Sequence, residues 1–516
     1  MKTILNISHP LPRLSPRLSP RLFAPTLLVA LLAGCSLAPT YERPAAPTAP
    51  TYPSGASYEA AAAGAADAKP ASDILWREFF ADARLREVIT LALANNRDLR
   101  VSALNIERAR AQYGIERAAL LPTLALNGEQ SASRIPGNVI QSQSGQAGQA
   151  SQSGAGGSSI TTRQYGVSLG VAAYELDFFG RVRSLSDAAL ELYLGTEEAR
   201  SAQQISLVAE VATLYLTAAA DLERLRLARE TLKSQQVSYE LSRSRFEAGV
   251  TSGVDMYDAQ TTVEVARSDV AVFTRAVALD RNALTLVVGA AVGEDLLPSG
   301  QQQRVTALAD LPAGLPSELL QRRPDVRQAE RTLRATNANI GAARAAFFPR
   351  ITLTGSAGTA SPNLSGLFDG GSSAWSFMPQ ITLPIFDGGV NSANLAIAKV
   401  DRDIAVASYE RSIQSAFREV ADALAQRGTL DQQLMSQQRL VEASSKSYAI
   451  LDARYRNGVD SYLSALISQR ALYAAQQSLI SVRLLNGTSL VTLYKALGGG
   501  WQSEDTAQAS SAPAKY

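Results

Sequence analysis

The side chains that most often perform chemistry in proteins are nearly absent from this sequence. Its 516 residues contain one histidine, His9, and one cysteine, Cys35. Both lie at the N-terminus, where a basic stretch is followed by a short apolar run, Leu27–Leu32, and by small residues before Cys35. This order is typical of a secretory signal peptide, here residues 1–34, and not of a membrane-spanning helix.

Removal of residues 1–34 leaves no imidazole, and Cys35 carries the only thiol. These losses exclude histidine-based acid–base catalysis, the usual Zn, Cu and Fe–S sites, and disulfides. The remaining 45 basic and 47 acidic residues give a net charge of about −2, which argues against a nucleic-acid partner. No mature segment has 18 consecutive apolar residues, so no transmembrane helix is expected. We predict that the chain is not an enzyme and has no cofactor or metal.

Cys35 is the candidate for covalent modification. Leu32-Ala33-Gly34-Cys35 resembles a bacterial lipobox, which implies that Cys35 receives a covalent lipid and becomes the first mature residue. Ser36 stands where an aspartate would retain a lipoprotein at the inner membrane, so the resemblance also implies sorting to the outer membrane. The alternative is an ordinary signal peptide with an unrelated cysteine.

Two predicted helix–turn–helix junctions, at Gly249 and Gly458, hold the next candidate residues. Glycine after a long helix suits the left-handed position that ends it. After the first junction, Ser252 and Asp255 have the spacing of a capping-box variant, and Asp258 follows on the same helix face. In a three-fold assembly each aspartate would form a ring of three carboxylates that could gate a narrow entrance. The alternative is that both only stabilise the helix start through its dipole.

The second junction is less acidic. Asp460 is a weaker candidate for the gate, and Ser464 and Ile467 occupy the positions that match Asp255 and Asp258. Any gate is therefore expected to be carried unevenly by the two junctions. The residues at both turns are candidates for docking a partner protein, or are only turn formers: Gly249, Val250, Thr251, Ser252, Gly458, Val459 and Ser461.

Four segments with alternating apolar and small polar residues predict strands, at about 121–134, 161–177, 350–360 and 375–386. One apolar face in segments of roughly ten residues fits a membrane barrel, although each segment alone also fits a soluble hairpin. Four strands cannot close a barrel in lipid, whereas three protomers supply twelve. Tyr165, Trp375 and Phe377 lie near predicted strand ends and could form a membrane girdle, or be ordinary strand packing.

Two proline-free segments, Val182–Ala248 and Val390–Asn457, predict unusually long helices, each roughly 100 Å if continuous. Apolar residues in both recur at alternating steps of three and four, which is coiled-coil spacing. The helices belong to an internal duplication, since Phe246–Val250 matches Tyr455–Val459. The predicted organisation is a signal peptide 1–34, a lipidated extended tether 35–72, a first repeat 73–290, a linker 291–316, a second repeat 317–497 and a C-terminal tail 498–516.

These features together resemble the TolC-like outer-membrane factor family, in its lipidated NodT-type branch. The resemblance covers nearly the whole mature chain and rests on five motifs: Cys35–Pro39, Trp76 with Phe79-Phe80, Leu93–Leu99, Arg322–Val326 and Leu383–Gly389. It implies a mixed, mainly α fold, in which a twelve-stranded β-barrel and a long helical coiled-coil barrel are completed by trimerisation.

The resemblance implies a passive trimeric conduit that carries small toxic compounds across the outer membrane. Its expected partners are a periplasmic adaptor (membrane fusion protein), an inner-membrane RND transporter and outer-membrane lipid. The sequence contains no Gly-x-x-x-x-Gly-Lys-Ser/Thr motif, so the energy is expected to come from the inner-membrane partner. Two alternatives stay open: the duct of a type I protein secretion system with an ABC exporter, and a lipid-anchored periplasmic scaffold without a pore.

Overall fold

The computed structural model describes residues 36–58, 71–136, 159–299, 306 and 322–500. The signal peptide, Cys35 and residues 501–516 lie outside the described residues, as does most of the predicted linker. The chain divides into two compact units. The first comprises the described part of Met1–Thr40 with Ile115–Asp187 and Asn337–Ala398, and the second comprises Tyr41–Gly114, Ala188–Thr336 and the described part of Lys399–Tyr516.

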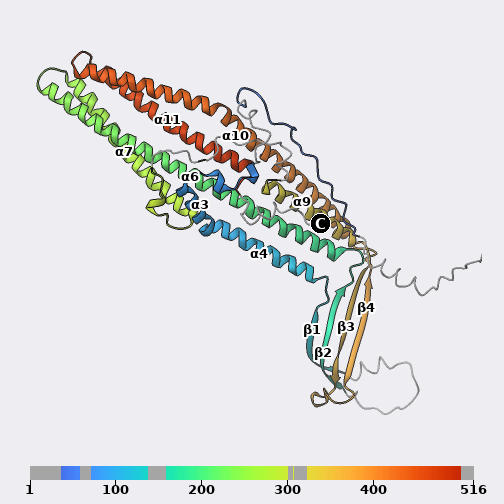
Figure 1. Ribbon diagram of the computed structural model, residues 1–516. Helices are drawn as coiled ribbons and strands as arrows, with labels where there is room; N and C mark the ends of the chain where they lie inside the picture. Colours follow the sequence, from blue (N-terminus) through green and yellow to red (C-terminus); the bar gives the residue numbers. More distant parts are fainter. Residues whose placement is uncertain (1–35, 59–70, 137–158, 300–305, 307–321, 501–516) are drawn as a thin grey trace, which may run out of the picture. The chain divides into compact units, whose positions relative to one another are not determined.

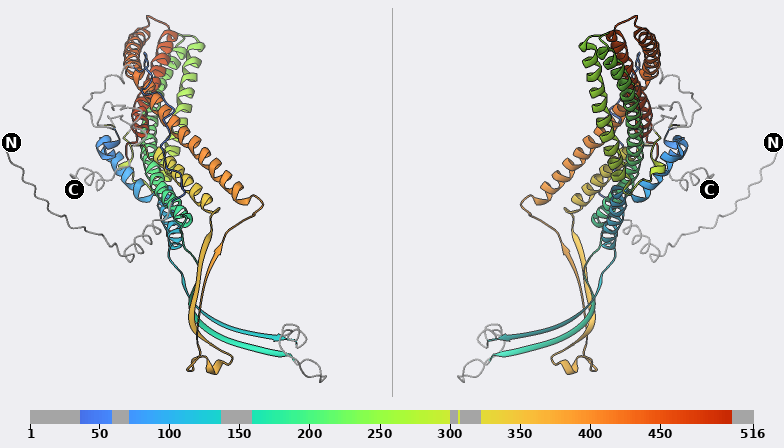
Figure 2. Two further views of the ribbon diagram at one scale, coloured as in Figure 1. Left: turned by 90° about the vertical axis from the view of Figure 1, so that its right-hand side faces the viewer. Right: turned by 90° about the vertical axis from the view of Figure 1, so that its left-hand side faces the viewer.

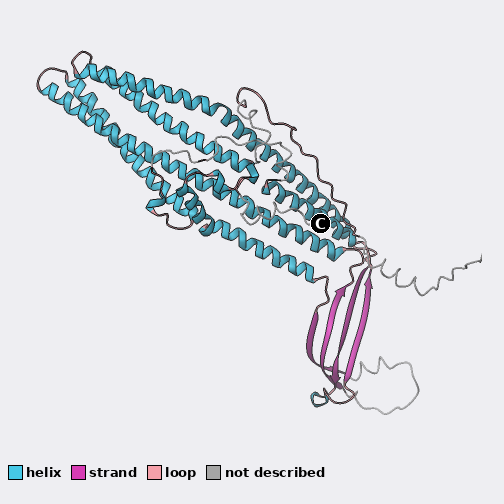
Figure 3. Ribbon diagram, in the orientation of Figure 1, coloured by secondary structure: helices cyan, strands magenta, loops and turns pink. Residues whose placement is uncertain are grey.

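The first unit contains one antiparallel sheet in the order β1-β2-β3-β4 (Figures 1 and 3). Its strands are β1 (Leu124–Ile135), β2 (Ile160–Glu175), β3 (Arg350–Ser361) and β4 (Ser373–Thr382). The four predicted strands are therefore present, because period-two patterning is a strong local signal. The fourth ends at Thr382, short of the predicted 386, since the next residues form the turn before a helix.

A β-bulge interrupts the pairing of β2 and β3 between Val171 and Tyr174. Ala173 lies within it at a φ of 51°, a left-handed conformation that alanine rarely adopts. The bulge shifts the alternation by one residue, so that Tyr174 follows Val171 on the apolar face. Simple alternation would place Ala173 there, and that expectation is wrong because a bulge adds one residue to the strand.

The second unit is built mainly from long helices, several of which continue into the first. Two helix–turn–helix pairs dominate it, and shorter helices accompany them (Figure 1). The α-helices among the described residues are α2 (Trp76–Phe79), α3 (Ala83–Asn95), α4 (Arg97–Ala118), α6 (Arg181–Glu247), α7 (Gly253–Val288), α9 (Pro324–Ala345), α10 (Val390–Arg456) and α11 (Tyr462–Ala496). Both α6 and α10 have 67 residues, and their starts and ends differ by 209 positions. The internal duplication and the two long helices are thus confirmed.

The main core of the second unit is aromatic and aliphatic. Phe79 and Phe80 are fully buried, and the Phe79 ring stacks on Tyr494 with centroids 4.1 Å apart. The predicted coiled-coil seam of α6 lies in this core, because Val208, Ala212 and their heptad neighbours are buried. The seam also explains why an 18-residue window of α6 is apolar enough to cross a membrane: 61% of that window is buried inside the chain.

The segment after the predicted lipid site is extended, as expected, and it is held by side chains of α9. Glu330 is the centre of this contact in the second unit. It accepts hydrogen bonds from Tyr41 at 3.1 Å, from Arg43 at 3.0 Å and from Arg334 at 2.8 Å. Burial acts to raise the pKa of Glu330, but the bonds from Arg334 and Arg43 outweigh it and hold the pKa below its ordinary value.

In the first unit, the carbonyls of two neighbouring residues accept further bonds. Arg344 donates to Leu37, and Asn337 donates to Pro39. The sequence did not indicate these contacts, because the partners are about 300 positions apart.

One acidic pair between α6 and α7 yields a stability prediction. Burial of the Asp280 carboxyl, together with the nearby Asp221 carboxylate, raises the Asp280 pKa to about 6, while Arg224 opposes the shift. The folded chain therefore binds a proton that the unfolded chain has released, and this stabilisation is lost as pH rises through about 6. Asp280→Asn should raise the thermal unfolding midpoint at pH 8, on the order of 2 °C, and the gain should shrink towards pH 4.

The control for this prediction is Asp422→Asn, because Asp422 is exposed and pairs with Arg418 only at 3.9 Å. It should show no pH-dependent gain. A gain from Asp280→Asn that is the same at both pH values would contradict the assignment.

Candidate functional site

The sheet of the first unit presents one continuous apolar face. The pairing places side chains of the four strands in rows across it. One row is Leu126, Leu169, Ala357 and Trp375, and the next is Leu124, Val171, Gly355 and Phe377. Leu126 is 74% exposed and Trp375 80% exposed, so nothing in the described chain covers this face. An apolar face of this size requires a non-aqueous partner.

The opposite face carries small polar residues, such as Ser168, Ser356 and Ser376. Charges on it are few. Glu175 and Arg350 form an ion pair at 2.6 Å, which Arg181 joins at 2.7 Å. Glu129 is the remaining charge on this face of the strands, and its side chain lies against Gly166. A polar face with a single unneutralised carboxylate can line water.

Both outer edges of the sheet are open. Strand β1 pairs only with β2, and β4 pairs only with β3, among the described residues. Their free N–H and C=O groups need partners, and in a medium without water that need is absolute.

The register places the three predicted girdle residues at different levels. Phe377 lies within the apolar face, two rows from its Ile351 end, and Trp375 lies one row from its Thr359 end, whereas Tyr165 pairs with Ser361 beyond the last apolar row. Phe386 is 92% exposed, in the turn after β4. Tyr165 and Phe386 are therefore better placed than Trp375 and Phe377 for the two borders of the apolar face.

The two predicted turns of the second unit have the same geometry. Gly249 has a φ of 72° and Gly458 a φ of 75°, which favours glycine. In the first turn, Gly249 donates to the Phe246 carbonyl and Val250 to the Arg245 carbonyl. The second turn repeats both bonds 209 positions later. This pair of bonds is the Schellman motif, so the glycine prediction is correct in its physical reason.

The carboxylates after the first turn are held differently from the prediction. Ser252 is the N-cap of α7 but makes no side-chain capping bond, so the expected capping box is wrong. Instead the Thr251 hydroxyl donates to the Asp255 carboxylate at 2.8 Å. The Asp255 carboxylate is therefore bonded by a side chain of the turn and not by the N-cap residue. Asp258 is half-buried, and no side chain in the described part of the chain bonds its carboxylate.

Asp460, at the second turn, is paired within its own hairpin. Arg454 donates two hydrogen bonds to it, at 2.6 and 2.9 Å. These bonds, with the charge of Arg454, lower the pKa of Asp460. The matching residue of the first hairpin, Arg245, instead donates to the carbonyls of Tyr455 and Arg456 at the end of α10. Arg245 thus joins the first hairpin to the second, whereas Arg454 bonds only within its own hairpin.

The predicted docking residues are nearly all exposed. Val250 is 75% and Val459 62% exposed, and Thr251 is half-buried. Behind them, Tyr455 and Tyr462 centre a small core between the hairpins. The Tyr455 hydroxyl bonds the Ser242 hydroxyl at 3.0 Å. Two exposed valines on a supported pair of turns form an accessible surface.

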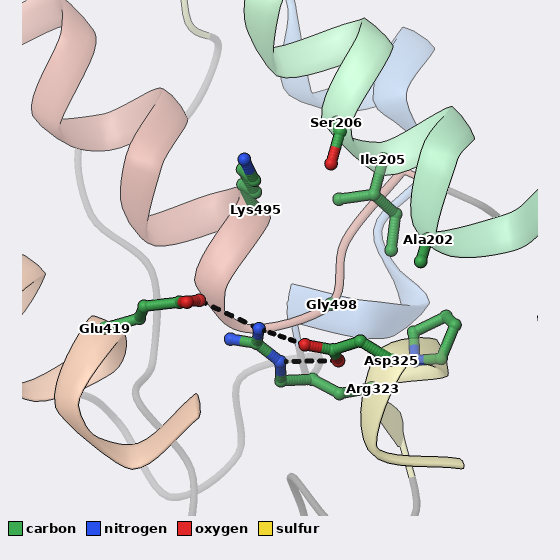
Figure 4. Close-up of a pocket in the computed structure, with 9 residues that line it drawn as sticks. Ala202, Ile205, Ser206, Arg323, Asp325, Glu419, Lys495 and Gly498 are labelled. Carbon is green, nitrogen blue, oxygen red and sulfur yellow. Dashed lines mark hydrogen bonds and ion pairs between the residues drawn. The ribbon is translucent and has the colours of Figure 1, made fainter. Parts of the chain in front are cut away.

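A cavity of about 210 Å³ in the second unit is bordered by Arg323, Glu419 and Lys495 (Figure 4). The buried Arg323 donates to Asp325 at 2.7 Å, to Glu419 at 2.8 Å and to the Ala496 carbonyl at 2.9 Å. Arg323 therefore ties the start of α9 to α10 and to the end of α11. All of its described bonds are internal, which indicates a structural role.

Comparison with known proteins decides the family. Residues 88–290 and 315–499 match the family described as "Outer membrane efflux protein". This chain belongs to that family. It is 48% identical, over 93% of its length and 95% of the relative, to the toluene efflux pump outer membrane protein TtgC of Pseudomonas putida. The antibiotic efflux pump outer membrane protein ArpC of Pseudomonas putida has the same identity and coverage.

The fold agrees with that assignment. The structure of the open state of the Neisseria gonorrhoeae MtrE outer membrane channel is similar with a TM-score of 0.79 and 40% identity, covering 91% of this chain and 99% of MtrE. The predictions of a mainly helical, duplicated fold with a four-stranded sheet, of an outer-membrane location and of an efflux function are confirmed. The apolar face of the sheet is accordingly its lipid-facing side.

Sequence reasoning missed Glu129, Arg245 and Arg454. Glu129 could have been found as the one charge in the polar alternation of its strand. For Arg245 and Arg454 the sequence reveals only that each hairpin has a basic residue four positions before its turn glycine. Their different partners depend on contacts between helices, which a periodic pattern does not encode.

Arg323 provides a test of the network in Figure 4. Arg323→Lys should lower the free energy of unfolding by about 2 kcal/mol. The single ammonium group of lysine cannot replace the guanidinium group, which bonds the carboxylates of Asp325 and Glu419 and the Ala496 carbonyl. Loss of helical circular dichroism in urea would measure the change. Arg322→Lys is the matched control, since Arg322 is 33% exposed and lies 3.7 Å from Asp73. Equal stability of the two variants would show that the fork is dispensable.

Proposed function

We propose that three copies of this chain form a passive conduit that carries small organic compounds from a periplasmic adaptor and an inner-membrane RND pump across the outer membrane. The relatives TtgC and ArpC are components of toluene and antibiotic efflux pumps, which supports apolar and amphiphilic molecules as cargo. The conduit itself performs no catalysis.

The open sheet is the observation that carries this proposal. Four strands with a lipid-facing side and two unpaired edges are unstable alone in hydrocarbon. Pairing β4 of one copy with β1 of the next satisfies every edge, and three copies supply twelve strands, an even number that suits a closed barrel. The face with Ser168, Ser356 and Glu129 would then line the conduit.

Helix α7 supports self-association independently. Its inner face is buried through Val277, Leu284 and their neighbours. On the opposite side, Val265, Val272, Leu279 and Leu286 recur every seven residues and are 60%, 41%, 58% and 80% exposed. A second apolar stripe at heptad spacing fits a helix of a neighbouring copy.

The two turns are suited to binding the adaptor and to controlling the periplasmic entrance. The exposed Val250 and Val459 would contact the adaptor. Asp255 and Asp258 would each contribute a ring of three carboxylates at the periplasmic entrance, which repels itself and binds cations. Asp460 contributes charge to that entrance only if its pair with Arg454 opens, so we place the gate mainly on the first hairpin. Cys35 would carry the lipid anchor.

The α7 stripe can be tested by one substitution. Leu279→Asp should abolish the trimer, because it places a carboxylate in an apolar seam between copies. Ala278→Asp is the matched control, since Ala278 is exposed on a different side of the same turn. Seminative gel electrophoresis of the purified proteins measures the trimer. A stable Leu279→Asp trimer would refute the proposed contact.

The docking surface can be tested with a thiol placed at the first turn. The mature chain has no thiol except that of Cys35, so Ser252→Cys can be cross-linked selectively in intact cells. Mass spectrometry of the captured partner should recover the adaptor of an RND pump. Thr285→Cys, exposed at the other end of α7, is the control and should not capture it. Recovery of an ABC exporter's adaptor would assign the conduit to protein secretion instead.

A further inference from the structure

The charges of the four strands are distributed unequally between the two faces. Five of their residues carry a formal charge, and three of these, Glu129, Glu175 and Arg350, lie on the polar face. The other two, Arg134 and Arg163, lie on the lipid-facing side, in the rows beyond the apolar residues. Arginine close to hydrocarbon is unfavourable unless its charge reaches the interface or a partner.

The two arginines are neighbours. Arg163 pairs with Ala132 and Arg134 with Thr161, so they occupy diagonal positions on the same face of the β1–β2 hairpin. Diagonal pairs lie roughly 7–8 Å apart, close enough for two long side chains to reach one group. Both are exposed. The Arg134 Nε donates to the Ser159 hydroxyl at 2.8 Å, and the structure gives its terminal nitrogens no partner among the described residues.

No carboxylate in the described part of the chain neutralises this pair. Among the described residues neither arginine has an acidic partner, and the sequence from Gln130 to Tyr165 contains no aspartate or glutamate. The hairpin continues past the last pair of β2 with β3 and bends away from β3 and β4 (Figure 2). The strands that carry acidic or apolar neighbours therefore do not cover the two arginines.

The depth of the pair follows from the register. The apolar rows run from Ile351 to Thr359 on β3, where Thr359 pairs with Val167. Eight residues span about 27 Å along a strand, which is about 20 Å of membrane thickness at the usual barrel tilt of about 40°. Tyr165 occupies the next row, and the two arginines the following two. They thus lie at the level of lipid headgroups, at the end of the sheet opposite Leu124 and Arg350, the residues with which β1 and β3 begin after α4 and α9.

We propose that Arg134 and Arg163 form a binding site for the phosphate groups of anionic glycolipids in the outer leaflet. The guanidinium fork matches phosphate oxygens in a bidentate manner. The apolar rows below would contact the acyl chains of the same lipid, and the Tyr165 hydroxyl would lie at the boundary between them. The proposal rests on the outer-membrane barrel inferred above, in which three copies would supply three such sites.

The experiment compares full-length trimers reconstituted in phosphatidylcholine nanodiscs with and without diphosphoryl lipid A. The variant is Arg134→Gln with Arg163→Gln. Its matched control is Arg200→Gln with Arg229→Gln, which removes the same charge from exposed positions of α6. Native mass spectrometry counts the lipid A molecules that stay bound to each trimer.

The wild type and the control should retain lipid A, and the hairpin variant should bind it about tenfold more weakly. Lipid A without phosphates should bind the wild type as weakly as the phosphorylated lipid binds the variant. Equal retention by the variant and the wild type, or equal retention of both lipids, would overturn the site. All samples are first checked for trimers by seminative gel. A chain that never trimerises would count against the proposed assembly, and a trimer that ignores lipid A only against this site.

Discussion

Every backbone amide that enters hydrocarbon must have a hydrogen-bond partner, and the sheet of this chain cannot meet that condition alone. Within the described ranges, strands β1 and β4 each have one unpaired edge, and one face of all four strands is apolar. Further copies of the chain could pair these edges. The second apolar stripe of α7, on the side opposite its buried face, points to the same kind of partner.

Local pattern predicted much of this fold because each element has a strong and simple period. The long helices end within one residue of the positions expected from the absence of proline and the glycines that follow. The alternation of the strands predicted the lipid-facing side, but not the bulge at Ala173, since a single inserted residue leaves no compositional trace. The bonds of Glu330 to the extended N-terminal segment join residues nearly 300 positions apart, and periodicity says nothing about such contacts.

The candidate site was predictable in outline only. The turn glycines follow from backbone sterics, which act within a few residues. The partners of the acidic groups follow from side chains across a turn or a helix pair: Thr251 for Asp255, and Arg454 for Asp460. Because the duplicated hairpins differ at these positions, the charge at the turns is unequal although their backbones are equivalent.

The equal length of α6 and α10 has an evolutionary consequence. The two turns are joined side by side through Ser242 with Tyr455 and through Arg245 with the end of α10. Deletion of seven residues from each arm of one hairpin would retract its turn by about 10 Å and separate these partners. Insertions and deletions in the helices are therefore tolerable only as coordinated events in both halves of the gene. The connections between the strands, which already differ in length between the halves, are free to drift separately.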